Sequence, residues 1–254
     1  RLAKKLERTN VQVVLIDKLN YHQFQPLFYQ VASSGLEPSA ISFPLRKIFQ
    51  EQENLCFRVA EVLHILPEEN KIDTSLGFID YDFLVIATGA GNSFFNMANL
   101  EKYSFPMKTT SEAIILRNKL LQNFEDAVCT IDTEEKKALL TTVVIGGGPT
   151  GVEISGALGE MKNFVVPKDY NEIKSKDVSI IIVEAGSRLL MHMAPKSSEK
   201  SKKYLEELGV QVLLDTKVVD YDGNLLTFAD GTSIKTKTII WAAGIAGNFI
   251  DGIP

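Results

Sequence analysis

The chain has 254 residues, of which 45% are hydrophobic, so it can bury a sizeable core in one large or two ordinary domains. Its formal net charge of -5 and its scattered Lys and Arg residues exclude the basic surface typical of proteins that bind nucleic acid. Two distant cysteines and three dispersed histidines predict neither a disulfide framework nor a metal site. No apolar run reaches the length of a spanning helix, so we expect this chain by itself to be soluble.

The chain begins with a helix-like stretch, RLAKKLERTN, and a buried-looking strand, VQVVLID, that ends on Asp17. A turn-rich β stretch then covers residues 59–82, and the sequence FLVIATGAG predicts a strand at 83–91. Pro106 and the sequence TTSE at 109–112 indicate a linker followed by a helix start. Short runs of Val and Ile that alternate with helical stretches predict an α/β fold with parallel sheets.

The same order recurs in the second half of the chain. There, the strand TVVIG, the turn GGGPTG, the helix VEISGALGEM and the strand VSIIIVE lead to a terminal acid, Glu184. A turn-rich β stretch and a strand, TIIWAAGIAG, follow as in the first half. Asp17 and Gly89 are 72 residues apart, and Glu184 and Gly244 are 60 apart. The repeat predicts two Rossmann-like dinucleotide-binding domains in tandem, with a strand and a glycine turn expected before Arg1.

The turn between the strand and the helix contains the pattern G-x-G-x-x-G, formed by Gly146, Gly148 and Gly151. The first glycine permits a tight turn, the second lets the backbone approach a pyrophosphate, and the third permits close packing of the helix and strand. The following helix offers N–H groups to the phosphates. This context favours dinucleotide binding, while a glycine-rich turn that only packs a helix onto a sheet is the structural alternative.

Two acids near this turn are candidate site residues. Glu184 can accept hydrogen bonds from a ribose diol and would repel a 2′-phosphate, so it favours NADH over NADPH unless Arg188 reaches the ribose. An exposed acid at a strand end is the alternative for Glu184. Glu153 is expected in the first turn of the helix, where it either interacts with the helix dipole or faces the bound cofactor.

Together, the segments YHQFQPLFYQVASSGLEPSAISFPLRKIF, LVIATGA, VVIGGGPTGVEISGALGE and TIIWAAGIAGN resemble the alternative, or type II, NADH dehydrogenases. These flavoproteins are similar in fold to the disulfide reductases that bind two dinucleotides. The resemblance implies FAD and NADH as cofactors, with hydride transfer from NADH C4 to flavin N5 and electron transfer to a membrane quinone without proton pumping. It also implies a peripheral enzyme at the cytoplasmic face of a membrane, and it leaves a homodimer open.

The resemblance also implies a set of site residues. Glu153 matches the acid near flavin and nicotinamide and is the catalytic candidate. The FAD-binding candidates are Asp17, Pro26, Leu27, Val62, Thr88 and Gly89. The NADH-binding candidates are Gly146, Gly148, Thr150, Gly151, Glu184, Ala243 and Gly244. The structural alternative for the segment FQPLFYQVA is an amphipathic helix that packs its apolar side. Such a helix can also lie near the flavin, so the two interpretations are compatible.

Three domain segments are expected: 1–107 as the first part of an FAD domain, 108–236 as an NADH domain, and 237–254 as a return to the FAD domain. The resemblance implies quinone-site residues and amphipathic membrane-binding helices, which we expect to lie outside this chain. We therefore expect a chain truncated at both ends that does not reduce quinone by itself. Three alternatives stay open: a flavoprotein that binds NADH to sense redox state, an enzyme similar to sulfide:quinone oxidoreductases, and a purely structural nucleotide-binding module.

Overall fold

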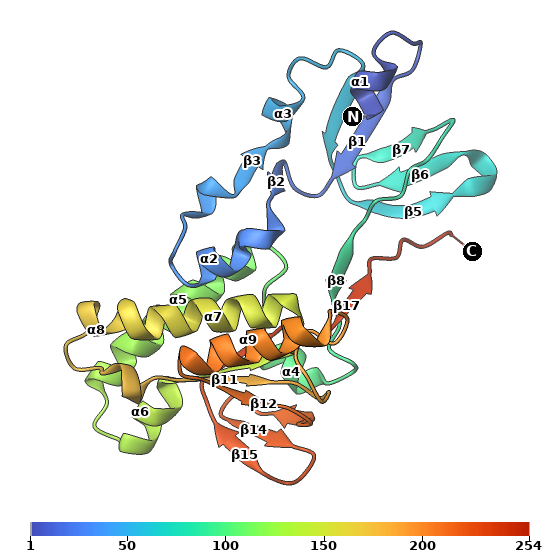
Figure 1. Ribbon diagram of the computed structural model, residues 1–254. Coiled ribbons are helices and arrows are strands. Elements are labelled where there is room, and N and C mark those ends of the chain that lie inside the picture. The colour runs from blue at the N-terminus through green and yellow to red at the C-terminus, as the bar shows by residue number, and fades with distance from the viewer. Residues whose placement is uncertain (1, 254) are drawn as a thin grey trace. The chain divides into compact units, whose positions relative to one another are not determined.

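The computed structural model describes residues 2–253, and the chain divides into two compact units (Figure 1). The first unit takes in Arg1–Phe24, Ser39–Gly91 and Ala246–Pro254. The second unit takes in Gln25–Pro38 and Asn92–Ile245. Each unit has its own sheets and its own buried residues.

The second unit is built on a five-stranded sheet, a three-stranded sheet and the helices around them. Its helices are α2 (Phe28–Ala32), α4 (Ala98–Tyr103), α5 (Thr110–Cys129), α6 (Thr133–Leu139), α7 (Pro149–Phe164), α8 (Val166–Asp169) and α9 (Pro195–Glu207). Its strands are β9 (Phe105–Pro106), β10 (Thr141–Ile145), β11 (Ser179–Val183), β12 (Val210–Leu213), β13 (Val218–Tyr221), β14 (Leu225–Phe228), β15 (Ser233–Lys235) and β16 (Thr238–Trp241).

The five-stranded sheet is parallel and has the order β12-β11-β10-β16-β9. From β10 the chain passes through α7 to β11 and through α9 to β12, and it later returns to the other side of β10 as β16. The strand order therefore reverses between β10 and β16. In open parallel sheets, ligands bind outside the carboxyl ends of the strands at such a point.

Two layers bury the faces of this sheet. Helix α7 packs against β10, β11 and β12, and its Ile154 and Leu158 are fully buried. The opposite face carries Val143, Ile181 and Trp241, which share one hydrophobic cluster with residues of β13 and β14. The alternation of side chains along a strand explains why successive residues of β10 face different layers. All five residues of β10 are buried, as is typical of a central parallel strand.

The first unit consists of short sheets and helical turns. Its helices are α1 (Leu2–Leu6) and α3 (Leu45–Ile48). Its strands are β1 (Val13–Asp17), β2 (Tyr21–Gln23), β3 (Ser42–Pro44), β4 (Leu55–Val59), β5 (Val62–Leu66), β6 (Lys71–Thr74) and β7 (Gly77–Asp80). Strands β1 and β4 pair in parallel, whereas β2-β3 and β5-β6-β7 are antiparallel. The remaining strands, β8 (Ala90–Asn92) and β17 (Ile245–Gly247), pair where the chain passes between the units.

The strand expected at 83–91 does not form over most of its length. Residues 83–89 have no regular secondary structure, and Phe83 and Val85 are 93% and 75% exposed. Within residues 2–253 no strand is paired with this stretch; its carbonyls at Thr88 and Gly89 accept hydrogen bonds from Asn248, but no regular ladder forms. Apolar β-branched residues thus predicted a strand, but strand formation also needs a neighbour.

Two other segments differ from the sequence expectation. The first helix ends early, at Leu6, because the backbone N–H of Thr9 and its hydroxyl both donate to the Leu6 carbonyl, at 2.9 and 2.7 Å. Strand β16 lies inside the sheet of the second unit. From the sequence, we expected the whole segment 237–254 to return to the first domain. After the second unit, the chain returns to the first unit at Ala246, nine residues later than expected. The assignment of one nucleotide to each domain stays a prediction.

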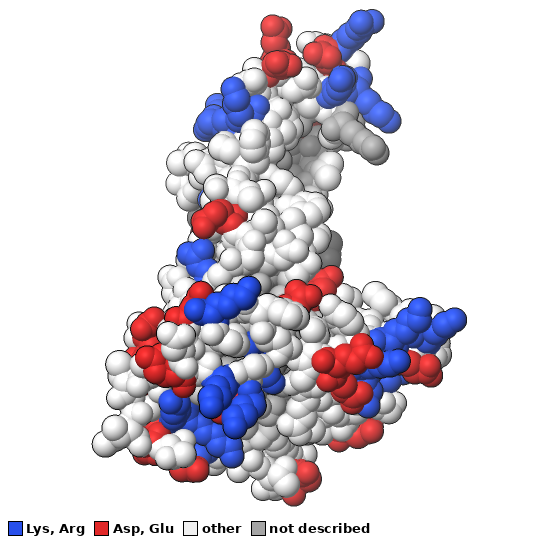
Figure 2. All heavy atoms as spheres, turned by 60° about the vertical axis from the view of Figure 1, so that its left-hand side comes forward, with Lys and Arg blue, Asp and Glu red and all other residues white. Residues whose placement is uncertain are grey.

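Charged residues are dispersed over the surface. Figure 2 shows Lys and Arg interspersed with Asp and Glu on the visible face, separated by uncharged areas. Such mixed charge gives no extended field of one sign on that face. Among the described helices, none has both the length and the apolar character required to cross a bilayer.

Replacing Leu158 with Ala should lower the free energy of unfolding by about 3 kcal/mol, because the side chain is fully buried and a cavity would remain. The fluorescence of Trp241, the single tryptophan, reports unfolding of the same unit in a urea titration. Leu121→Ala is the matched control, since Leu121 is 39% exposed and its loss should change stability by less than about 1 kcal/mol. Equal losses for both variants would contradict the described packing of α7.

Candidate functional site

The glycine turn between β10 and α7 makes backbone contacts that side chains would block. Gly146 has a φ of +112°, and a Cβ there would lie 2.6 Å from the carbonyl carbon of Ala242. A Cβ at Gly151 would lie 1.8 Å from the carbonyl oxygen of Gly146. At Gly148, in contrast, a Cβ would have no neighbour within 4 Å. Two glycines therefore permit close packing, and the third borders open space where a phosphate could approach.

Helix α7 presents its N-terminus to this open space. Gly148 is the N-cap residue and Pro149 the first helical residue, and no cap side chain accepts a hydrogen bond from the first N–H groups of the helix. The first N–H groups of a helix have no partner inside the helix, and they carry a partial positive charge. The turn thus offers the donors and the charge that a pyrophosphate requires.

Glu184 lies against the same turn. It follows β11 directly, and its carboxylate accepts hydrogen bonds from Gly147 N at 2.6 Å and from Gly186 N at 2.7 Å. The guanidinium of Arg188 instead donates to the carbonyls of Met191 and Met193, at 2.7 and 3.2 Å. A negative charge therefore borders the glycine turn, and the nearby arginine is engaged with main-chain oxygens.

The end of β16 forms another wall of the turn. Ala242 N donates to the Ile145 carbonyl at 2.8 Å, and a Cβ at Gly146 would lie 2.7 Å from the Cα of Ala243. A Cβ at Gly244 would come within 2.4 Å of the Ser93 carbonyl oxygen. Ala243 therefore lies beside Gly146 at the carboxyl end of β10, and Gly244 lies against Ser93; their place at the nicotinamide stays a prediction.

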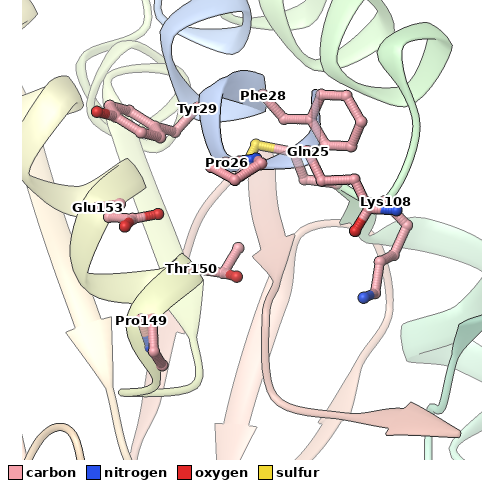
Figure 3. Close-up of a pocket in the computed structure, with 9 residues that line it drawn as sticks. Gln25, Pro26, Phe28, Tyr29, Lys108, Pro149, Thr150 and Glu153 are labelled. Atoms are coloured by element: carbon pink, nitrogen blue, oxygen red, sulfur yellow. The ribbon is translucent and has the colours of Figure 1, made fainter. Parts of the chain in front are cut away.

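A pocket of about 280 Å³ lies next to the start of α7. Figure 3 shows its lining residues, with the carboxylate of Glu153 and the ammonium of Lys108 on opposite sides and Thr150 between them. The residues that line it are Gln25, Pro26, Phe28, Tyr29, Met107, Lys108, Pro149, Thr150 and Glu153. All of them belong to the second unit. The pocket is therefore lined both by the start of α7, directly after the glycine turn, and by the segment FQPLFYQ.

Glu153 is the fifth residue of α7 rather than a member of its first turn. The effect of the helix dipole falls off within the first turn, so this position weakens the dipole interpretation. Although Glu153 is an exposed residue, partial burial of its carboxylate raises its pKa above the ordinary glutamate value. A raised pKa on a carboxylate that lines a pocket is typical of functional sites.

The remaining expected FAD residues are distributed over both units. In the first unit, Asp17 is exposed at the end of β1, and its Oδ1 accepts from Leu19 N at 2.8 Å. Val62 begins β5 and is half-buried. The hydroxyl of Thr88 donates to the Asn248 carbonyl at 2.6 Å, and Asn248 N donates to the carbonyl of Gly89 at 3.1 Å.

In the second unit, Pro26 lines the pocket and Leu27 precedes α2 without lining it. Phe28, Val31 and Ala32 of α2 are buried, so the expected amphipathic helix does pack its apolar side. Sequence reasoning did not assign Gln25, Tyr29, Met107 or Lys108 to a site. Gln25 and Tyr29 lie inside the segment FQPLFYQ, whereas nothing in the local sequence of the linker that carries Lys108 indicates a site.

Comparison with known proteins agrees with this architecture. Residues 1–249 match the family model of the pyridine nucleotide-disulphide oxidoreductases. The chain is 34% identical to the type II NADH:quinone oxidoreductase Ndh of Mycobacterium tuberculosis, over 97% of this chain and 55% of that protein. The structure of NDH2 from Plasmodium falciparum in complex with NADH matches with a TM-score of 0.86 and 27% identity, covering 93% of this chain and 51% of that one.

The sulfide:quinone oxidoreductase of Aquifex aeolicus matches with a TM-score of 0.73 and 19% identity, over 94% of this chain and 55% of that one, a likeness of fold. The chain belongs to the pyridine nucleotide-disulphide oxidoreductase family. The predicted α/β dinucleotide-binding fold and the resemblance to type II NADH dehydrogenases are both confirmed. The chain spans about half the length of these relatives, between 51% and 55%.

The glycine turn allows a matched test. Gly148→Ala should fold normally, since its φ of -73° suits alanine and its Cβ would meet nothing, yet it should weaken NADH binding about tenfold by occupying the phosphate approach. Gly151→Ala should destabilise the unit itself, because its Cβ would collide with the Gly146 carbonyl. Thermal unfolding and NADH titration of both variants separate the two effects. Unchanged NADH affinity in Gly148→Ala would place the phosphates elsewhere.

The Glu153→Gln variant should be slightly more stable than the wild type at about pH 7 and equally stable at about pH 4. Because the pKa of Glu153 is raised, the folded state binds a proton more tightly than the unfolded chain. The stability of the wild type therefore falls as the pH rises from the ordinary glutamate pKa through the pKa in the folded state. Urea unfolding over this pH range measures the difference. A variant that becomes less stable than wild type as pH rises would instead assign Glu153 to the helix dipole.

Proposed function

We propose that this chain is the nucleotide-binding part of a flavin-dependent NADH:quinone oxidoreductase that does not pump protons. The supporting observation is that the glycine turn of Gly146, Gly148 and Gly151, called the cradle below, borders open space at Gly148, and that a pocket begins at the first turn of α7 directly after it. The relatives named as NADH:quinone oxidoreductases support the same reaction class.

In this proposal, NADH binds along the start of α7. The pyrophosphate is held by the N–H groups after Gly148, with Gly146 and Gly151 keeping the cradle closed behind it. Glu184 binds the ribose diol by releasing one of its backbone hydrogen bonds, and Thr150 lies between cradle and pocket. Ala243 and Gly244 border the nicotinamide, and Glu153 orients it or handles a proton beside it.

FAD supplies the redox chemistry when it is bound, since it accepts the hydride of NADH and passes electrons on to quinone. The described residues suit such a group. Asp17 has a carboxylate oxygen free of the Leu19 bond for a ribose hydroxyl, and Gly89, with a φ of +68°, borders open space. Val62 and Thr88 complete the proposed FAD set in the first unit. Pro26 and Leu27, which lie in the second unit, are flavin candidates through the resemblance alone.

The proposals of a quinone substrate and of membrane attachment rest on the similar proteins. Their names include quinone oxidoreduction, and quinones dissolve in bilayers, so we propose a peripheral enzyme at the cytoplasmic face of a membrane. The relatives are nearly twice as long as this chain, which leaves room in them for quinone contacts and for membrane-binding helices. A homodimer is part of the same proposal.

Two alternatives have less support. A sulfide:quinone oxidoreductase uses cysteines beside its flavin, yet Cys56 and Cys129 are free and neither lines the pocket of Glu153. The likeness to the Aquifex aeolicus enzyme concerns the fold alone. A flavoprotein that senses redox state would bind NADH in the same cradle and would differ only in slow transfer to quinone.

Anaerobic stopped-flow on the whole FAD-loaded oxidoreductase, of which we propose this chain to be a part, tests the proposal. NADH should bleach the flavin at least tenfold faster than NADPH at equal concentration, because Glu184 repels a 2′-phosphate. A short-chain quinone should then reoxidise the flavin rapidly. The measurement is flavin absorbance in each half-reaction.

The outcomes separate the alternatives. Fast bleaching with slow reoxidation would favour the redox sensor, and absence of a flavin that NADH bleaches would contradict the proposal. Glu153→Gln serves as an internal comparison, since it should slow turnover in a protein that remains folded. Unchanged kinetics in both half-reactions would remove Glu153 from the reaction.

A further inference from the structure

Among the described residues that line the pocket of Glu153, Lys108 is the only one with a cationic side chain. Its backbone is fixed, because Lys108 N donates to Glu112 Oε2 at 2.6 Å in the loop that precedes α5. Its side chain is half-buried, and within residues 2–253 its ammonium has no carboxylate within ion-pair distance. A half-buried cation that faces a pocket without such a partner is available to a ligand.

The nearest acid along the chain does not neutralise this cation. Glu112 closes the capping box of α5, where its Oε2 accepts from Lys108 N and Thr109 N, and its Oε1 accepts from Asn92 Nδ2 at 3.4 Å. The Glu112 carboxylate is therefore engaged with N–H donors. The Lys108 ammonium instead extends into the pocket, opposite Glu153 (Figure 3).

A pocket with one cation and one carboxylate on opposite sides fits a group that both accepts and donates hydrogen bonds. A primary carboxamide has this character, since its carbonyl oxygen accepts and its NH₂ group donates. The pocket also begins at Pro149 and Thr150, directly after the cradle for the pyrophosphate. A dinucleotide that is anchored at the cradle can place its nicotinamide here.

We propose that Lys108 binds the carboxamide oxygen of the nicotinamide while Glu153 accepts from its NH₂ group. This inference rests on the proposed function, and it assigns Lys108 as a further substrate-binding residue. The pair would fix the rotation of the carboxamide and thereby the face of the ring that is presented for hydride transfer.

Calorimetric titration of the FAD-loaded protein with NAD⁺ and with ADP-ribose tests this assignment. ADP-ribose retains the pyrophosphate but has no nicotinamide. Lys108→Met should weaken NAD⁺ binding about tenfold and leave ADP-ribose binding unchanged, because only NAD⁺ loses a hydrogen bond to a charged donor. The variant should also weaken 3-acetylpyridine adenine dinucleotide by a similar factor, since that analogue keeps the carbonyl oxygen and lacks the NH₂ group.

Each other result decides against the inference. Equal weakening of NAD⁺ and ADP-ribose would place Lys108 on the phosphates or riboses, and unchanged binding of both would remove it from the site. Unchanged affinity of Lys108→Met for the acetylpyridine analogue would contradict a contact between Lys108 and the carbonyl oxygen. A wild type that binds neither NAD⁺ nor ADP-ribose would instead overturn the proposed function, and this inference with it.

Control variants guard against structural effects. Lys200→Met removes an exposed lysine of α9 that does not line the pocket, so it should leave both affinities unchanged. Lys108→Arg keeps a cationic donor and should retain most of the NAD⁺ affinity. If Lys108→Met does not fold, Lys108→Leu provides the same comparison, since it also lacks a donor, with retained ADP-ribose binding as the proof of folding.

Discussion

The close approach of α7 to the end of β10 is the contact on which the rest of the site depends. No atom larger than hydrogen fits on Gly151, where a Cβ would lie 1.8 Å from the Gly146 carbonyl oxygen. This contact sets where α7 begins and how it crosses the sheet. The buried side chains of Ile154 and Leu158 then hold the helix on β10, β11 and β12. The position of the cradle is therefore determined by backbone packing rather than by the residues that would touch a ligand.

Helix α7 connects two kinds of chemistry over a single turn. Its N-terminus offers N–H donors for phosphate, and Glu153, one turn further on, offers a carboxylate with a raised pKa to the neighbouring pocket. Because both groups are on one rigid element, their separation is fixed by the helix itself. A ligand anchored at the turn is therefore presented to the pocket in a defined position, which is how a protein supplies orientation to a redox reaction.

Charge is arranged around this helix in a similar way. Glu184 borders the cradle and is held by two backbone N–H groups, whereas Arg188 is bound to carbonyl oxygens. On the other side, Lys108 and Glu153 face each other across the pocket. Glu153 lies on α7, Glu184 directly follows β11, and the backbone N–H of Lys108 is hydrogen-bonded to Glu112. The site can therefore distinguish ligands by where they carry charge and hydrogen-bonding groups, with little rearrangement of the chain.

The sequence by itself determined the parts of this protein that depend on local pattern. Glycine spacing, the buried strands and Glu184 at a strand end predicted the β10-α7-β11 unit, because these features are set by conformational freedom and periodicity along one segment. Only the tertiary structure decided the rest. It brought Lys108, from a linker, and Gln25 and Tyr29, from another segment, to the pocket of Glu153. It also left residues 83–89 without a strand and placed β16 in the second unit. Both depend on which distant strands pair, and hydrogen bonds between strands are not encoded in the local sequence of either one.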